Sequence, residues 1–231
     1  MSPLPTHPDI GNGRGQLLVR DRLLVEAASM FRYKGYGHTT TRELAERVGL
    51  QKASLYHHMV TKESLLFDIC TSALKRIGDS VEEAVKDQTE PAVRLRTAVM
   101  AHVRSALQDA DMHATMLIEM RSLSPQHYEI VHGARSQYEE MVRGFVQEAQ
   151  GARELRRDVE SKWMTLSLLN LLNWTIFWYH SGAGVTPEEL GEILFDIYLN
   201  GTGARTPFES DVIVRRGAAK AGDGRGRSAA R

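Results

Sequence analysis

The feature that most constrains the fold is a pair of short helices predicted between residues 40 and 58. Thr40 is followed three positions later by Glu43, a capping box in which each side chain accepts a hydrogen bond from the other residue's backbone amide. The helix "TRELAERV" (residues 41–48) ends at Gly49, and a second short helix is predicted over residues 52–58. Two short helices joined by a tight turn with glycine form a helix-turn-helix. The apolar contacts that set their angle are expected from Ala45, Val48, Leu50 and Leu55.

The rest of the chain also has helical spacing of apolar residues, and no segment alternates as a strand does. We therefore predict an all-α protein with about nine helices. The predicted helices cover residues 17–33, 41–48, 52–58, 62–85, 91–107, 111–123, 125–151, 158–180 and 187 to about 200. The predicted domains are a disordered arm (1–15), a three-helix domain that contains the helix-turn-helix (16–62), a second helical domain (63–203) and a disordered basic tail (204–231).

The composition is that of an ordinary soluble globular protein, with 42% hydrophobic and 25% charged residues. A single cysteine, Cys70, excludes a disulfide framework and a multi-cysteine zinc site within one chain, which favours a cytoplasmic location. The N-terminus lacks the apolar stretch of a signal peptide. The longest apolar run, residues 163–179, contains polar side chains throughout, so we expect no membrane span.

Charge is distributed unevenly along a chain whose net charge is zero. Residues 1–76 carry 11 Lys and Arg against 7 Asp and Glu, whereas residues 77–204 carry 11 against 19. A basic front and an acidic middle suggest that the front binds a polyanion. The second short helix presents Lys52, Ser54, Tyr56 and His57, whose side chains can donate to phosphates or base edges.

Two other interpretations of "YHH" (residues 56–58) stay open. A metal site would need three or four ligands, and no cysteine or carboxylate lies close by in the sequence. Alternatively, Tyr56 packs in the core while the two histidines are solvated surface.

The segment "EAASMFRYKGYGHTTTRELAERVGLQKASLYHHMVTKESLL" resembles the DNA-binding domain of the TetR family of bacterial transcriptional regulators, over residues 23 to 66. The resemblance implies that Thr40 and Arg42 contact phosphates, and that Lys62 does so as well. It also implies DNA contacts from Lys52, Ala53, Ser54, Tyr56 and His57. The chain departs from the family at Gln51, usually Ser, and at Met59, usually Phe.

The helix predicted over residues 158–180 is apolar nearly all round and must be covered on both sides. A second copy of the chain could cover one side, with the last helix completing a two-fold symmetric four-helix interface. Such a homodimer would place two DNA-binding helices on a palindromic operator. A monomer with a wide core is the alternative. The predicted interface residues are Leu171, Trp178, Leu190, Ile193, Leu194 and Ile197.

Polar residues scattered through the apolar middle helices suggest a cavity for a small-molecule effector. Each one singly could also be a satisfied core histidine or a surface charge. The ligand-binding candidates are Arg104, His113, Glu119, Arg121, Tyr128, Asn170, Asn173, Trp174 and Trp178.

The C-terminal half is similar to a TetR branch that regulates breakdown of fatty acids, aromatic acids and steroids. The similarity is carried by Leu155-Arg156-Arg157-Asp158, by Trp178-Tyr179 with Gly182, and by Thr186 to Leu190. His180-Ser181 and Ala152-Arg153 depart from that pattern. The branch implies an acyl-CoA thioester as effector, and a free aromatic or lipophilic compound is the alternative.

The expected function is a ligand-responsive transcriptional repressor that needs no cofactor. Residues 16–62 are its predicted helix-turn-helix DNA-binding domain, and residues 63–203 its predicted helical ligand-binding and dimerisation domain. An enzyme is not expected, because the sequence has no glycine-rich phosphate loop and no nucleophile elbow. A helix-turn-helix used as a protein-binding adaptor is a third class. Binding to specific duplex DNA separates it from the repressor.

Overall fold

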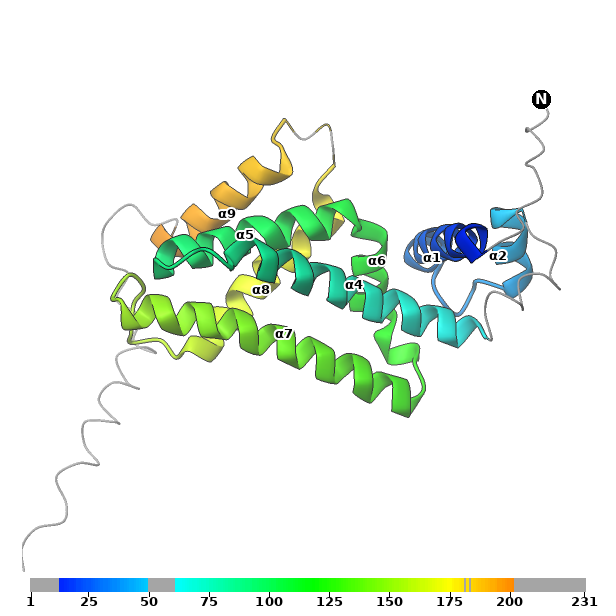
Figure 1. Ribbon diagram of the computed structural model, residues 1–231, viewed down its shortest axis with the longest axis horizontal. Coiled ribbons are helices and arrows are strands. Elements are labelled where there is room, and N and C mark those ends of the chain that lie inside the picture. Colours follow the sequence, from blue (N-terminus) through cyan, green and yellow to red (C-terminus); the bar gives the residue numbers. More distant parts are fainter. Residues whose placement is uncertain (1–12, 50–60, 181, 183, 202–231) are drawn as a thin grey trace, which may run out of the picture. The chain divides into compact units, whose positions relative to one another are not determined.

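The computed structural model describes residues 13–49, 61–180, 182 and 184–201, with only the backbone for residues 13–19. Within these ranges the chain is helical and contains no strand (Figure 1), so the predicted all-α class is confirmed. The helices are α1 (Gly13–Lys34), α2 (Thr41–Val48), α4 (Lys62–Val85), α5 (Pro91–Gln108), α6 (Ala110–Glu119), the 3-10 helix η1 (Met120–Ser122), α7 (Pro125–Gly151), α8 (Ser161–Trp178) and α9 (Pro187–Asn200). The helix predicted over residues 52–58 lies outside the described residues. None of the described helices combines the length and hydrophobicity needed to cross a bilayer.

Both predicted capping boxes form. The Glu43 amide donates to Thr40 Oγ1 at 3.2 Å, and the Thr40 amide donates to Glu43 Oε2 at 2.9 Å. α9 begins in the same way at Thr186 and Glu189, with Pro187 in its first turn. Gly49 ends α2 with φ +74°, a left-handed conformation that glycine adopts without steric cost. These contacts place both helix starts where the local sequence predicts them.

Several predicted boundaries are wrong. α1 begins at Gly13 and not at Leu17, and the helix predicted over residues 111–123 is α6 followed by η1. α8 begins at Ser161 and not at Asp158. The Asp158 carboxylate accepts from Arg156 Nε at 2.8 Å instead of capping a helix. The Gln150 side-chain amide donates to the carbonyls of Arg156 and Val159 at 2.8 and 2.9 Å. Together these bonds hold the backbone before Ser161 in a turn, so the helix starts three residues later.

Residue contacts group the chain into two compact units. Unit 1 holds the described residues up to Asp79 together with Ser105–Gln137, and unit 2 holds Ser80–Arg104 together with the described residues from Tyr138 onward. The predicted boundary between residues 62 and 63 falls inside unit 1. The reason is that the first turn of α4 bonds to residues elsewhere in that unit, as described below.

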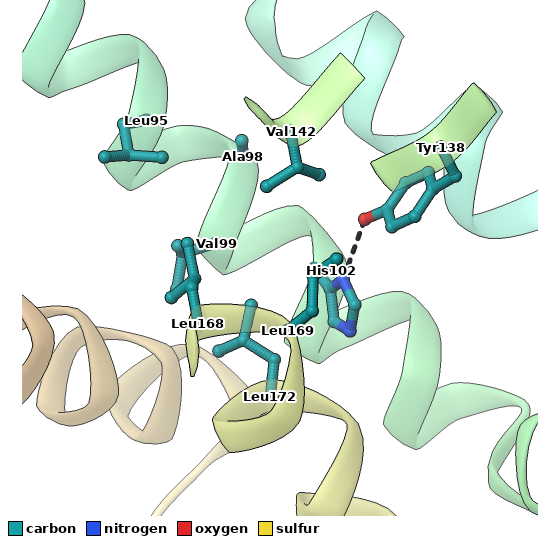
Figure 2. Close-up of a pocket in the computed structure, with 9 residues that line it drawn as sticks. All are labelled: Leu95, Ala98, Val99, His102, Tyr138, Val142, Leu168, Leu169 and Leu172. Atoms are coloured by element: carbon teal, nitrogen blue, oxygen red, sulfur yellow. Dashed lines mark hydrogen bonds between the residues drawn. The ribbon is translucent and has the colours of Figure 1, made fainter. Parts of the chain in front are cut away.

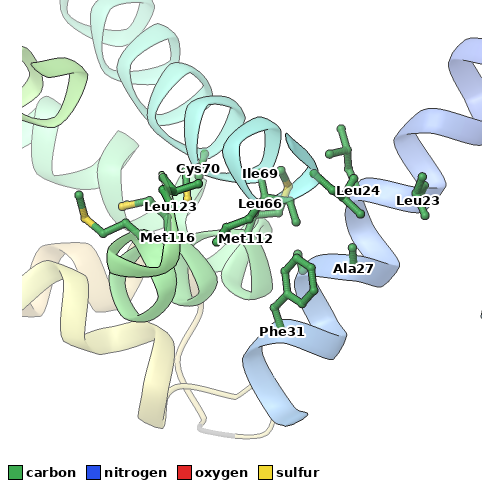
Figure 3. Packing of buried hydrophobic residues seen from close by; sticks show 14 of the residues in the cluster. Leu23, Leu24, Ala27, Phe31, Leu66, Ile69, Cys70, Met112, Met116 and Leu123 are labelled. Atoms are coloured by element: carbon green, nitrogen blue, oxygen red, sulfur yellow. The ribbon is translucent and has the colours of Figure 1, made fainter. Parts of the chain in front are cut away.

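The core of unit 1 is built by α1, α2, α4 and α6. Figure 3 shows core residues from α1, α4 and α6. Leu23, Ala27 and Phe31 recur along one face of α1 and are fully or almost fully buried. They share this core with Leu66 and Ile69 of α4. α2 adds Leu44, Ala45 and Val48. Burial of these three side chains in the core stabilises the short α2, since an eight-residue helix is marginal alone.

Candidate functional site: a DNA-binding segment and an apolar cavity

The N-terminus of α2 carries two of the predicted DNA contacts. Thr40 is exposed and caps the helix. Arg42 is in the first turn, and its side chain is 81% exposed. Its Nε donates to Glu46 Oε1 at 2.9 Å, and this hydrogen bond and charge raise the pKa of Arg42. A positive helix end with an exposed guanidinium beside it suits an anionic phosphate.

The second short helix cannot be compared with its prediction. Lys52, Ala53, Ser54, Tyr56 and His57 lie outside the described residues. Their DNA contacts remain predictions from the sequence.

Lys62, the predicted phosphate lysine at the start of α4, is half-buried and bonds within the chain. Its Nζ donates to the carbonyl oxygens of Tyr36 at 2.9 Å and Thr39 at 3.0 Å. The same atom lies 4.2 Å from the centre of the Tyr36 ring, within cation–π range. An ammonium has three N–H donors, and two of them are used here.

Glu119, a predicted ligand-binding residue, also contacts Tyr36. Its Oε1 accepts from the Tyr36 backbone amide at 3.0 Å. Two further bonds join α6 to α1: Arg32 Nη1 to Asp111 Oδ1 at 2.9 Å, and Thr115 Oγ1 to the Ala28 carbonyl at 2.8 Å. The Glu119 carboxylate therefore belongs to the contact between α6 and the segment before α2.

Unit 2 contains a small cavity of about 10 Å³ between α5, α7 and α8 (Figure 2). Its only two polar side chains come from α5 and α7, where Tyr138 Oη lies 2.7 Å from His102 Nδ1. Burial raises the pKa of Tyr138, so the phenol keeps its proton and can donate to the imidazole. The lining residues are Leu95, Ala98, Val99, His102, Tyr138, Val142, Leu168, Leu169 and Leu172.

None of the nine predicted ligand-binding residues lines this cavity. His113 and Tyr128 pack in or against the unit 1 core, and Glu119 bonds to Tyr36. Asn173 is half-buried, whereas the remaining five are exposed: Arg104, Arg121, Asn170, Trp174 and Trp178. The candidates were predicted because they are polar or amphipathic, whereas most of the residues that line the cavity are apolar. The i, i+3, i+4, i+7 spacing of the four α5 residues (95, 98, 99 and 102) predicts a buried face, which does not distinguish a cavity from a packed core.

The predicted dimer residues divide into two groups. Leu190 and Leu194 are buried inside the chain, so they support α9 from within. Trp178, Ile193 and Ile197 are exposed, and Leu171 is half-buried. The exposed apolar set on α8 also includes Trp174 and Phe177, whose rings lie 4.7 Å apart. We call Trp174, Phe177, Trp178, Ile193 and Ile197 the α8–α9 face.

Comparison with known proteins identifies the family. The description "Bacterial regulatory proteins, tetR family" matches residues 23–69, and "Tetracyclin repressor-like, C-terminal domain" matches residues 88–202. The crystal structure of the TetR family transcriptional regulator PfmR from Thermus thermophilus is 33% identical, with a TM-score of 0.73 over 80% of this chain and 100% of that chain. The chain belongs to the TetR family.

Two further proteins are similar over most of the chain. The HTH-type transcriptional repressor KstR2 of Mycolicibacterium smegmatis is 27% identical over 188 residues, 79% of this chain and 89% of the relative. The crystal structure of AibR in complex with isovaleryl coenzyme A and operator DNA has a TM-score of 0.71 at 22% identity, covering 78% of this chain and 98% of that chain. Since TetR proteins are DNA-binding transcription factors, this chain is a transcriptional regulator and not an enzyme.

Proposed function

We propose that the protein is a homodimeric repressor that binds a palindromic operator and is released by a hydrophobic acyl-CoA thioester from a catabolic pathway. The repressor KstR2 is similar over most of its length. AibR, whose fold is similar to that of this chain, forms a complex with isovaleryl coenzyme A and operator DNA. These likenesses support the class of effector, and the site itself supports its hydrophobic character.

The observation that carries the proposal is the cavity of unit 2. Seven of its nine lining residues are Leu, Val or Ala, and its polar groups are a single His–Tyr pair. Such a lining suits an acyl chain with one hydrogen-bonding group, for example a thioester carbonyl. At about 10 Å³ the cavity has room for roughly one water molecule. An effector must therefore separate α5, α7 and α8 to enter.

Effector entry would move α5, and α5 is followed directly by α6. Asp109 alone separates the two helices, and its backbone amide donates to the Ser105 carbonyl at 3.2 Å. α6 in turn bonds to α1 through Asp111 and Thr115. The effector releases DNA only if it binds the DNA-incompetent arrangement more tightly, and about 1–3 kcal/mol of coupling is typical.

The α8–α9 face supports the proposed dimer. Its five large apolar side chains are each at least 36% exposed in the single chain. Large apolar side chains exposed on two neighbouring helices favour coverage by a partner. A second copy would cover it symmetrically and set the spacing of the two DNA-binding segments.

A gel shift tests the effector. The probes are labelled duplexes that tile the DNA upstream of the protein's own gene. The full-length protein is bound to a shifted duplex and titrated with acyl-CoAs of increasing chain length. We expect release by at least one thioester, and no release by coenzyme A alone.

Parallel titrations with the free acids and with aromatic compounds separate the alternatives. Release by these compounds while every thioester fails would reject the acyl-CoA proposal in favour of a free lipophilic effector. A Leu169→Trp variant, which fills the cavity, should need higher thioester concentrations while keeping its DNA affinity.

A further inference from the structure

Tyr36 lies in the short segment between α1 and α2, four residues before the Thr40 cap. A segment outside a helix has no intrahelical partner for its backbone groups, so other groups must bond to them. Here both polar backbone groups of Tyr36 bond to side chains from distant helices, and the carbonyl also accepts from the Thr39 amide at 3.2 Å. Glu119 of α6 accepts from the amide at 3.0 Å, and Lys62 of α4 donates to the carbonyl at 2.9 Å.

Lys62 extends this contact toward α2. Its second donated bond, 3.0 Å long, ends on the carbonyl of Thr39, the residue before the helix cap. The Tyr36 ring lies under the ammonium on one side and packs edge-on against Phe31 of α1, with the ring centres 5.1 Å apart. One lysine thus holds both the middle and the end of the segment that leads into α2.

The helix ends that supply these two side chains are themselves anchored. Next to Lys62, Glu63 accepts from the Ser124 amide at 3.0 Å and lies 2.8 Å from His127 Nδ1. The bonds of Asp111 and Thr115 to α1 hold α6 along its length. Lys62 and Glu119 therefore project from helix ends that are bonded to other parts of unit 1.

We infer that Lys62 and Glu119 are positioning residues that together clamp the Tyr36 backbone and so orient α2 for DNA. This inference rests on the proposed DNA-binding function and deepens it. It replaces a phosphate contact for Lys62 and a ligand contact for Glu119 with one shared role. It also makes the last turn of α6 the place where effector binding would act on the DNA-binding segment.

Salt dependence of DNA binding separates positioning from phosphate contact for Lys62. Anisotropy with the upstream duplexes is measured for the full-length protein at several salt concentrations. Lys62→Met keeps the alkyl stem and loses the donors. We expect roughly tenfold weaker binding at every salt concentration, the size of a typical coupling between sites. A phosphate contact would instead lower the slope of log affinity against log salt by about 0.9, and that result would overturn the inference.

Matched variants control for charge. Lys75→Met removes the same charge from the same helix, at a side chain that is 74% exposed and paired with Asp79. Its affinity should equal that of the wild type. Lys62→Arg should restore much of the lost binding, because a guanidinium can donate to both carbonyls.

Variants of Glu119 test the same inference independently of Lys62. Glu119→Ala leaves the Tyr36 amide without its acceptor, so DNA binding should weaken to a similar extent with an unchanged salt slope. Glu119→Gln should recover binding, because its side-chain carbonyl can still accept. Removal of a negative charge alone would strengthen binding to DNA, so wild-type or tighter binding by Glu119→Ala would overturn the inference.

Amide hydrogen exchange tests the clamp without DNA. The Tyr36 amide should be protected in the wild type, and should exchange at least tenfold faster in Glu119→Ala, with the α1 core still protected. An unprotected wild-type amide would refute the clamp, whatever the DNA data show. If the wild type binds no upstream duplex while this amide is protected, the proposed function fails and the clamp stands.

Discussion

His113 is a buried histidine in the core of unit 1, although its polarity made it a ligand candidate. It is 2% exposed on α6. Desolvation lowers its pKa to about 4; the charge of Asp109 opposes this shift and that of Arg76 adds to it. The imidazole is therefore neutral at pH 7, and its role in the described chain is that of a core side chain.

This depressed pKa predicts a loss of stability in acid. The unfolded histidine has a pKa near 6.5, so between about pH 6.5 and 4 the unfolded state binds more protons and stability falls as pH falls. From pH 7.5 to 5.5 the wild type should lose about 1 kcal/mol through this residue. Urea unfolding at both pH values, on wild type and His113→Leu, isolates the effect. Equal losses in the two proteins would assign the pH dependence to other groups.

At the scale of helices, α9 packs on α5 at a close approach. A Cβ atom added at Gly191 would lie 2.8 Å from Met100 Sδ and 3.4 Å from Met100 Cα. Beside this contact, Arg96 Nε donates to Glu192 Oε2 at 2.8 Å, and a second bond completes the fork between Arg96 and Glu192. The missing side chain of Gly191 thus allows α9 to approach α5 closely.

Gly191→Val should push α9 away from α5. Overpacking of this kind costs about 1–3 kcal/mol, and here the branched side chain meets both the thioether and the backbone of Met100. Gly133→Val on α7 is the matched control, since a Cβ there meets nothing within 4 Å. Denaturant melts should show a clear loss for Gly191→Val and little change for Gly133→Val. Similar midpoints for the two variants would mean that α9 adjusts without cost.

At the scale of the whole molecule, the α8–α9 face determines whether two copies associate. Two of the residues predicted from the sequence to form the dimer interface, Leu190 and Leu194, are instead buried within the chain. The proposed interface is therefore formed by the exposed residues. Two of them, Trp174 and Phe177, pack on each other.

A charge in this face should separate the dimer. Ile197 is 37% exposed, and Ile197→Glu would bury an unpaired carboxylate in an apolar interface. Val93→Glu places the same charge at a 43% exposed position on α5 and serves as control. Sedimentation velocity should give a dimer for wild type and Val93→Glu, and a monomer for Ile197→Glu. A dimeric Ile197→Glu would exclude this part of α9 from the interface.

Helix positions and the fold family follow from local chemistry that the sequence displays. Each capping box joins residues three apart, and Gly49 ends α2 through its own backbone conformation. The start of α8 was mispredicted because the Asp158 carboxylate bonds to Arg156 and not to a helix amide. A carboxylate can accept hydrogen bonds from several nearby donors, and the amino-acid composition does not predict which of these bonds forms.

The sequence by itself determined which of the described segments are helices and that the N-terminal part is a TetR-type DNA-binding domain. Only the tertiary structure decided what Lys62 and Glu119 do, since their common partner Tyr36 lies 26 and 83 residues away in the chain. The same holds for the cavity, whose lining combines positions from α5, α7 and α8. Bonds between near neighbours in the chain can be predicted from spacing, whereas contacts between distant residues exist only once the helices have packed.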